Sequence, residues 1–198
     1  MVVILPKSVF FHVPKAGGTW VTQVLLEGVK GAYKIEPDIK AKDDFNGIHL
    51  PTNRMSWKGK SKFIFIRHPL SWYQSIWKYH NTHQERWFPD PENKNDFYKY
   101  CPGTNFALFM DKVMRYFPTG YYNQVLGAFL DGADYVGKQE NLKNDLENIL
   151  KKIGEDVEPL ALDIPATNVS KDLFCDYTKV HKDFVLKVES SIIERYYE

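Results

Sequence analysis

The stretch that most constrains the fold of this chain is "FFHVPKAGGTW", which runs from Phe10 to Trp20. An apolar run typical of a buried strand, Val9 to Val13, ends in a loop with two adjacent glycines, and a helical pattern follows from Thr19 to about Gly28. Backbone N–H groups of a glycine loop that opens a helix bind phosphate oxygens. The order strand, glycine loop, helix therefore predicts an anion site near the start of an α/β domain.

The position of the lysine in this loop argues against an ordinary nucleoside-triphosphate site. That signature, Gly-x-x-x-x-Gly-Lys-Ser/Thr, places the lysine after the last glycine, whereas Lys15 precedes Gly17 and Gly18. The stretch "MSWKGKS", which ends at Ser61, comes near the signature but lacks the upstream glycine at the required spacing. A nucleotide kinase or phosphohydrolase is the main alternative function, and a tight turn with a solvated lysine is the structural alternative.

A second unit of the same kind begins at Lys62 with "KFIFIRHP", a β-branched and aromatic run that predicts a central strand. Pro69 fits the first turn of a following helix. Arg67 closes the strand and Ser75 lies eight positions further on, so that a guanidinium and a hydroxyl can hold a terminal phosphate. An arginine at a strand end is also a common ion-pair partner. The carboxyl ends of parallel strands, however, are where open α/β sheets bind ligands.

The remaining pattern alternates strands with helices and predicts an α/β fold, with three layers (α/β/α) and a mainly parallel central sheet. A third strand is predicted at Asp134 to Gly137. Residues 81–104 read as a long excursion that carries a short helix at most and forms a lid or substrate segment. We predict a single domain over 1–198, with further helices at Phe106 to Tyr116, Asn141 to Ile153 and Tyr177 to Tyr197.

Composition limits the partners and the compartment. The net charge of +1 predicts no strong attraction to nucleic acid. The N-terminal apolar run is too short for a signal peptide, and no segment approaches the ~20 apolar residues of a membrane span, so we predict a soluble cytoplasmic protein without a membrane partner.

Cys101 and Cys175 are interpreted as free thiols, with a single bridge as the alternative. Histidines and cysteines are scattered without ligand spacing, so no metal site is predicted.

Taken together, these stretches resemble the sulfotransferase family that uses 3′-phosphoadenosine 5′-phosphosulfate (PAPS). "PKAGGTW" is similar to the loop that binds the 5′-phosphosulfate, and "RHPLSWYQS" to the segment that binds the 3′-phosphate. "GIHLP" lies between them, where family members carry the catalytic histidine, which corresponds here to His49. "YVGKQENL" and "ATNVSKD" are similar to later segments in the same order. The resemblance implies the P-loop NTPase-like sulfotransferase fold.

The resemblance also implies the chemistry and its residues. A sulfuryl group would move from PAPS to a hydroxyl or amine of a carbohydrate or small-molecule acceptor, leaving 3′-phosphoadenosine 5′-phosphate (PAP), without a metal. The catalytic roles fall to Lys15, which stabilises the leaving phosphate, and to His49, which acts as general base. The structural alternative for His49 is a loop histidine that caps a turn before Pro51. The remaining PAPS-binding residues would be Ala16, Gly17, Gly18, Thr19, Trp20, Arg67, Ser75 and Lys171.

Two of these binding residues, and the function itself, have alternative interpretations. Trp20 stacks on adenine or packs in the core beside Val24, and Lys171 is only a candidate to complete the 3′-phosphate site, because the Arg-Lys-Gly segment of the cytosolic branch is missing. Gln139 stands where many relatives carry a tyrosine that touches the adenine. A binding module that holds an adenine nucleotide without chemistry is the second alternative function. Aromatic residues of the excursion could pack on a sugar or phenol: Trp87, Phe88, Tyr98 and Tyr100.

Overall fold

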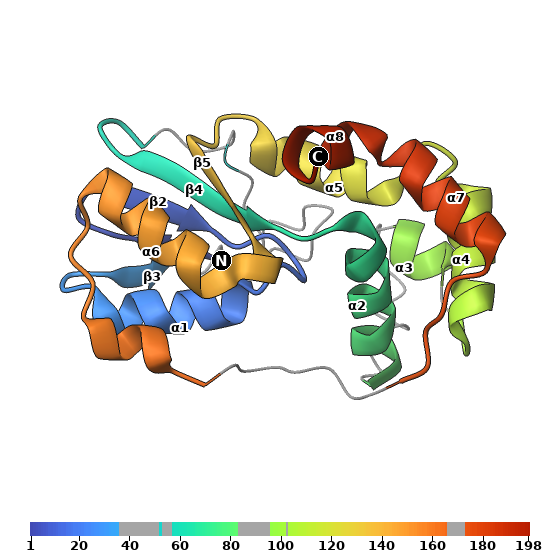
Figure 1. Cartoon of the computed structure of the whole chain (residues 1–198), viewed down its shortest axis with the longest axis horizontal. Coiled ribbons are helices and arrows are strands. Elements are labelled where there is room, and N and C mark those ends of the chain that lie inside the picture. Colours follow the sequence, from blue (N-terminus) through green and yellow to red (C-terminus); the bar gives the residue numbers. More distant parts are fainter. Residues whose placement is uncertain (36–51, 53–56, 83–95, 102, 166–172) are drawn as a thin grey trace. The chain divides into compact units, whose positions relative to one another are not determined.

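The computed structural model describes residues 1–35, 52, 57–82, 96–101, 103–165 and 173–198 (Figure 1). The chain divides into two compact units, each built from two segments. The sheet unit comprises Met1–Arg67 with Leu126–Val169, and the helical unit comprises His68–Val125 with Ser170–Glu198. The prediction of one domain over 1–198 stays a prediction.

The sheet unit contains a five-stranded sheet with the strand order β3-β1-β2-β4-β5. Strand β2 pairs in parallel with β4, and β4 in parallel with β5, whereas β1 pairs antiparallel with both β2 and β3. All strands but β1 therefore run in one direction, which confirms the predicted mixed α/β class with a mostly parallel sheet. The strands are β1 (Val2–Ile4), β2 (Ser8–Phe11), β3 (Tyr33–Ile35), β4 (Ser61–Ile66) and β5 (Tyr135–Lys138).

Two of these strands, β1 and β3, were not predicted, and they have only three residues each. So short a run carries no period of its own, and hydrogen bonds with a neighbour define it. The three predicted strands are present, with bounds shifted by one or two residues. Strand β1 joins β2 through a tight turn in which the Leu5 N–H donates to the Ser8 carbonyl at 2.9 Å.

Helices of the sheet unit pack on these strands (Figure 1). Helix α1 (Gly18–Gly28) follows β2, as predicted, and packs on β1 and on the short 3-10 helix η4 (Pro159–Asp163). Helix α6 (Leu142–Ile153) follows β5 through a second short 3-10 helix, η3 (Gln139–Asn141), and packs on β4 and β5. Helix α5 (Tyr121–Leu130) was not predicted.

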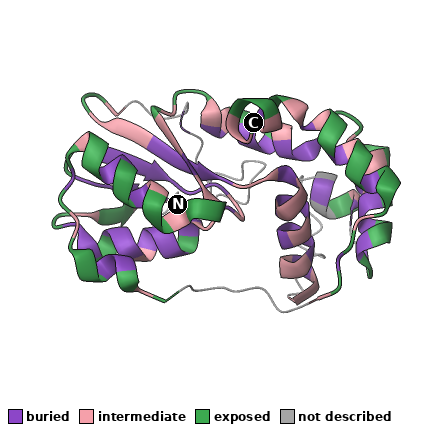
Figure 2. Cartoon of the chain, in the orientation of Figure 1, coloured by how far each residue is buried: buried purple, intermediate pink, exposed green. Residues whose placement is uncertain are grey.

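The central strands are buried over consecutive residues, as Figure 2 shows by its purple strands. Strand β1 is buried throughout, β2 from Ser8 to Phe11, and β4 from Phe63 to Ile66. Successive side chains in a strand point to opposite faces, so both faces of these strands are covered. This burial holds the carboxyl ends of β2 and β4 on a rigid support.

A buried carboxylate ties α6 to the start of β2. Glu155 is 6% exposed, and its Oε1 accepts hydrogen bonds from the Lys7 N–H at 2.7 Å and the Ser8 hydroxyl at 2.8 Å. Replacing Glu155 by alanine leaves both donors without this acceptor, so we expect the free energy of unfolding to fall by roughly 2 kcal/mol. Guanidinium denaturation measures it, with Glu147→Ala on the exposed face of α6 as the control. Equal stability of the two variants would contradict this account.

The helical unit is built from α2 (Pro69–Thr82), α3 (Asp96–Tyr100), α4 (Phe106–Tyr116), the start of α5, α7 (Lys179–Val188) and α8 (Ser190–Tyr196). The prediction for α4 is confirmed. The predicted final helix is wrong as one piece, because the chain breaks at Glu189 between α7 and α8. Helix α3 is the part of the predicted excursion that the structure describes as helical after Thr82.

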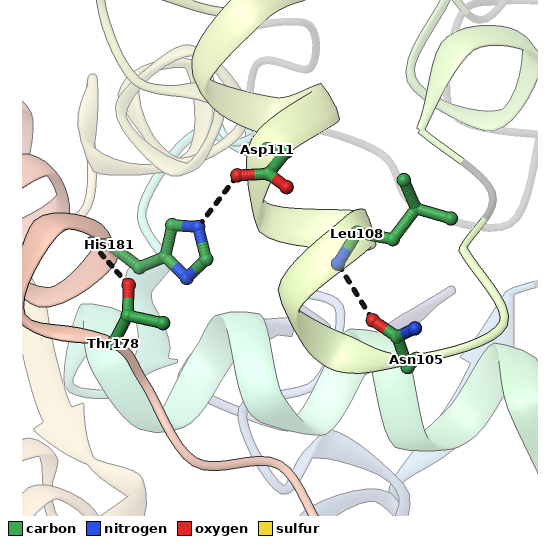
Figure 3. A network of polar contacts seen from close by, with 5 residues as sticks. All are labelled: Asn105, Leu108, Asp111, Thr178 and His181. Carbon is green, nitrogen blue, oxygen red and sulfur yellow. Dashed lines mark hydrogen bonds and ion pairs between the residues drawn. The ribbon is translucent and has the colours of Figure 1, made fainter.

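Figure 3 shows the side-chain caps of α4 and α7 and the buried histidine that joins the two helices. Asn105 caps α4 by accepting from the Leu108 N–H at 2.8 Å, and Thr178 caps α7 by accepting from the His181 N–H at 3.2 Å. The His181 Nε2 lies 2.9 Å from an Asp111 carboxylate oxygen. These polar contacts fix where both helices begin and how α7 lies against α4.

The break at Glu189 has a tertiary cause. The Glu189 carboxylate accepts hydrogen bonds from the Tyr73 hydroxyl at 2.7 Å, the Tyr122 N–H at 3.1 Å and the Asn123 N–H at 2.8 Å. It therefore caps the N-terminus of α5 from within the helical unit, and its side chain is wholly buried. A glutamate is a good helix former, so its local sequence gives no signal of this break.

Two further predictions can be checked on the described residues. Cys101 and Cys175 are both free and buried, so the interpretation as free thiols is confirmed. Within the described ranges, no helix combines the length and the apolar character that a membrane crossing needs.

Candidate functional site

The loop between β2 and α1 has an unusual backbone conformation at two positions. Lys15 has φ 62° and Gly17 has φ 82°, both in the left-handed region. Among the described residues, Lys15 is the one non-glycine residue with positive φ. A side chain in this region costs about 1–2 kcal/mol, and such residues concentrate at functional sites. The loop therefore keeps a strained lysine at the point where the sequence predicts phosphate binding.

The two adjacent glycines of the loop each admit a neighbouring side chain. A Cβ atom at Gly17 would lie 2.8 Å from a methyl group of Leu142 and 3.4 Å from Gln139 Cγ. A Cβ atom at Gly18 would lie 2.4 Å from the His12 ring. The sequence analysis explains these glycines by the close approach of a phosphate. In the structure, no side chain fits at either position unless its neighbours move.

The sheet places Arg67 beside this loop. Phe11 of β2 and Ile64 of β4 are partners in parallel strands, so the residues that follow both strands emerge at the same edge. The Arg67 Nη1 donates a long hydrogen bond of 3.5 Å to the Lys15 carbonyl oxygen. The structure therefore brings together Lys15 and Arg67, whose side chains the sequence predicts to bind the two ends of one nucleotide.

Exposure differs among the other loop residues. Ala16 is buried, whereas Thr19, in the first turn of α1, is exposed. Trp20 is only 8% exposed, and its indole N–H donates to the Ile164 carbonyl oxygen at 2.8 Å. This position favours the core-packing alternative for Trp20, and adenine stacking stays a prediction.

Three of the predicted binding and catalytic residues are not described together with this loop. Ser75 is buried in α2 and belongs to the helical unit. His49 and Lys171 lie outside the described residues. Thr52, three residues after His49 in the chain, is buried and donates from its hydroxyl to the Phe129 carbonyl at 2.7 Å, near the end of α5.

The aromatic residues of the predicted lid are described only in part. Trp87, Phe88 and the Tyr98 side chain lie outside the described part. The Tyr100 ring stacks on Tyr116 of α4, with ring centroids 4.9 Å apart. Tyr100 therefore packs within the helical unit, and its contact with a substrate stays a prediction.

Leu142 is a neighbour of the loop that the sequence analysis missed. It lies more than a hundred residues from Gly17 along the chain, and the parallel pairing of β4 with β5 brings it to the same edge. Leu142 falls within the helix predicted at Asn141 to Ile153, but the sequence gives no signal that it lies close to Gly17.

Among the residues that the structure describes, no three His, Cys, Asp or Glu side chains are grouped so that they could hold a metal ion.

Comparison with protein-family models gives no match for this chain, and comparison with curated proteins gives none either.

Proposed function

We propose that this chain is a sulfotransferase that moves a sulfuryl group from PAPS to an acceptor hydroxyl or amine. The observation that carries the proposal is the strained loop lysine, Lys15, with Arg67 hydrogen-bonded to its carbonyl oxygen at 3.5 Å. Two cations at one sheet edge suit a ligand with an anionic group at each end. The full three-layer sulfotransferase fold and its P-loop-like nucleotide site belong to the same proposal.

The residues of the sheet unit fit such a ligand by their chemistry. Backbone N–H groups at Gly17, Gly18 and Thr19 open a helix and favour phosphate oxygens. Lys15 adds a positive charge beside them, and the Arg67 guanidinium can hold a second phosphate with paired N–H donors.

PAPS supplies a sulfuryl group joined to its 5′-phosphate through a bridging oxygen. In the proposed transfer, the bond from sulfur to that oxygen breaks while sulfur bonds to the acceptor oxygen or nitrogen. Lys15 stabilises the negative charge that collects on the departing phosphate, which becomes part of PAP. The acceptor proton passes to His49, the general base that the resemblance implies.

The segment that comes nearest to a triphosphate-binding signature is the Gly-Lys-Ser run at 59–61, and its structural context does not favour the kinase alternative. Gly59 lies in a turn, Ser61 begins β4, and the Lys60 ammonium donates to the Pro6 carbonyl at 2.8 Å. A triphosphate loop must follow a strand and open a helix. The Gly-Lys-Ser run at 59–61 instead precedes a strand, so it does not have that context.

Ligand-dependent thermal stability tests the proposal. At a concentration of 100 times its Kd, PAP is expected to stabilise the folded chain by about 2.7 kcal/mol, because it binds the folded state alone. AMP lacks the 3′-phosphate, and we expect a clearly smaller shift of the unfolding midpoint at the same concentration. A larger shift with ATP and Mg²⁺ than with PAP would instead support the kinase alternative.

A variant of Arg67 makes this test residue-specific. Arg67→Ala is expected to reduce the shift caused by PAP toward that caused by AMP, while the shift caused by AMP changes little. Lys151→Ala, an exposed substitution on α6, is the control and is expected to behave like the unaltered protein. An equal loss for both nucleotides would remove the assignment of Arg67 to the 3′-phosphate.

A further inference from the structure

His12 lies directly under the first residue of α1. The residue is 8% exposed, and its ring stacks against Phe10 with centroids 6.3 Å apart and an interplanar angle of 28°. A Cβ atom at Gly18 would be 2.4 Å from His12 Cδ2 and 2.6 Å from Cγ and Nε2. The imidazole therefore occupies the space that any side chain at position 18 would need.

This contact acts on the part of the loop that presents donors. Gly18 is the first residue of α1, and Gly17 before it is held in the left-handed conformation. The backbone of His12 is tied to the N-terminus of the chain, because its N–H donates to the Met1 carbonyl at 3.3 Å. The ring thus belongs to a residue at the buried end of β2, and it supports the first turn of α1. The backbone N–H groups of a first helical turn have no partner within the helix.

The glycine before Gly18 also has close neighbours. Gly17 faces Leu142 and Gln139, from the start of α6 and from η3, at contact distances for a Cβ of 2.8 Å and 3.4 Å. The two adjacent glycines of the loop therefore have different close neighbours, His12 at Gly18 and Leu142 and Gln139 at Gly17. Removing either neighbour gives the loop room to move.

We propose that His12 is a positioning residue of the anion loop: its ring, fitted against the missing side chain of Gly18, sets the position of the N–H groups that bind the 5′-phosphate of the nucleotide. The inference rests on the proposed function. His12 acts through Gly18 and does not itself contact the nucleotide.

Four variants test this role: His12→Ala, Gly18→Ala, the double variant, and Gly28→Ala as a matched control. Gly28 lies at the other end of α1, where a Cβ would meet the Ala161 Cβ at 2.5 Å, so this control introduces a similar clash far from the loop. The Kd for PAP is measured by calorimetry at a temperature where the unliganded proteins are folded. The unfolding midpoint of each variant is measured without ligand.

His12→Ala is expected to raise the Kd for PAP about tenfold or more, because small displacements of binding groups cost large factors. Gly18→Ala is expected to weaken binding further, and the added His12→Ala change is expected to restore part of that loss, since it makes room for the methyl group. Gly28→Ala is expected to lower the unfolding midpoint while leaving the Kd within about twofold.

The outcomes separate this inference from the function on which it rests. If the unaltered protein does not bind PAP, the proposed function fails and the inference fails with it. If the unaltered protein binds PAP and His12→Ala binds it equally well, with only a lower unfolding midpoint, His12 is an ordinary core residue and the function stands. Should His12→Ala not fold, His12→Asn replaces it. The shorter asparagine side chain removes most of the atoms that contact Gly18 and keeps a polar group.

Discussion

Replacement of Lys15 by alanine is expected to lower turnover by about 10²–10³-fold, the usual effect of losing one group that stabilises a developing oxyanion. The ammonium is the charge that the proposed transfer uses on the departing 5′-phosphate. The lysine sits at φ 62°, a conformation that alanine also finds unfavourable, so this substitution removes the charge without relieving the backbone. Release of PAP from PAPS, with water as the acceptor, measures the effect.

A second substitution at the same position separates charge from backbone strain. Lys15→Gly is expected to lower turnover as much as Lys15→Ala, but to stabilise the fold by about 1 kcal/mol relative to it, because glycine accepts the left-handed region. Lys151→Ala on α6 serves as the control for loss of a lysine in the same unit. Turnover near that of the unaltered protein in Lys15→Ala would remove the assigned role.

The stability of the helical unit is expected to fall as the pH rises from about 4.5 to about 7. Burial raises the pKa of Glu189 from its ordinary value of 4.5 to about 7, against the hydrogen bonds from Tyr73, Asn123 and Tyr122, which lower it. Between these two pH values the folded chain holds a proton that the unfolded chain has lost, so the free energy of unfolding decreases as the pH increases. The total effect is about 3 kcal/mol.

The variant Glu189→Gln isolates this contribution, because its side chain does not titrate. Denaturation between pH 4.5 and 8 is expected to show a steeper loss of stability in the unaltered protein than in Glu189→Gln. Glu140→Gln, at an exposed position in η3, is the matched control and is expected to keep the full slope. Equal slopes for the unaltered protein and Glu189→Gln would show that the buried carboxylate does not govern this window.

The same carboxylate affects its hydroxyl partner. Burial, and then the charge of Glu189, raise the pKa of Tyr73 well above its ordinary value. The Tyr73 hydroxyl in turn accepts from the Tyr121 N–H at 2.9 Å while donating to Glu189. Tyr73 therefore stays neutral and hydrogen-bonded, and the pair acts as a structural cap for α5.

Elements with a strong local signal were predictable. Helix α4 matches its predicted bounds because Asn105 caps it and a regular apolar stripe is buried at Phe106, Phe109, Met110 and Val113. Helix α1 was predictable from its glycine loop and its apolar spacing. Strands β1 and β3 were not, because three residues cannot show a period, and α7 and α8 were merged because Glu189 favours a helix in its own sequence.

The amino-acid sequence by itself determined the local order of strand, glycine loop and helix, and the arginine that closes a second strand. Those features depend on residues close together in the chain, whose spacing and backbone preferences are visible without partners. Only the tertiary structure decided that Arg67 reaches the Lys15 carbonyl, that Gly18 lies against His12, and that Gly17 lies against Leu142. The contacts of Gly17 and Arg67 join segments separated by 52 to more than a hundred positions, and the pairing of β2, β4 and β5 brings those segments to one edge of the sheet.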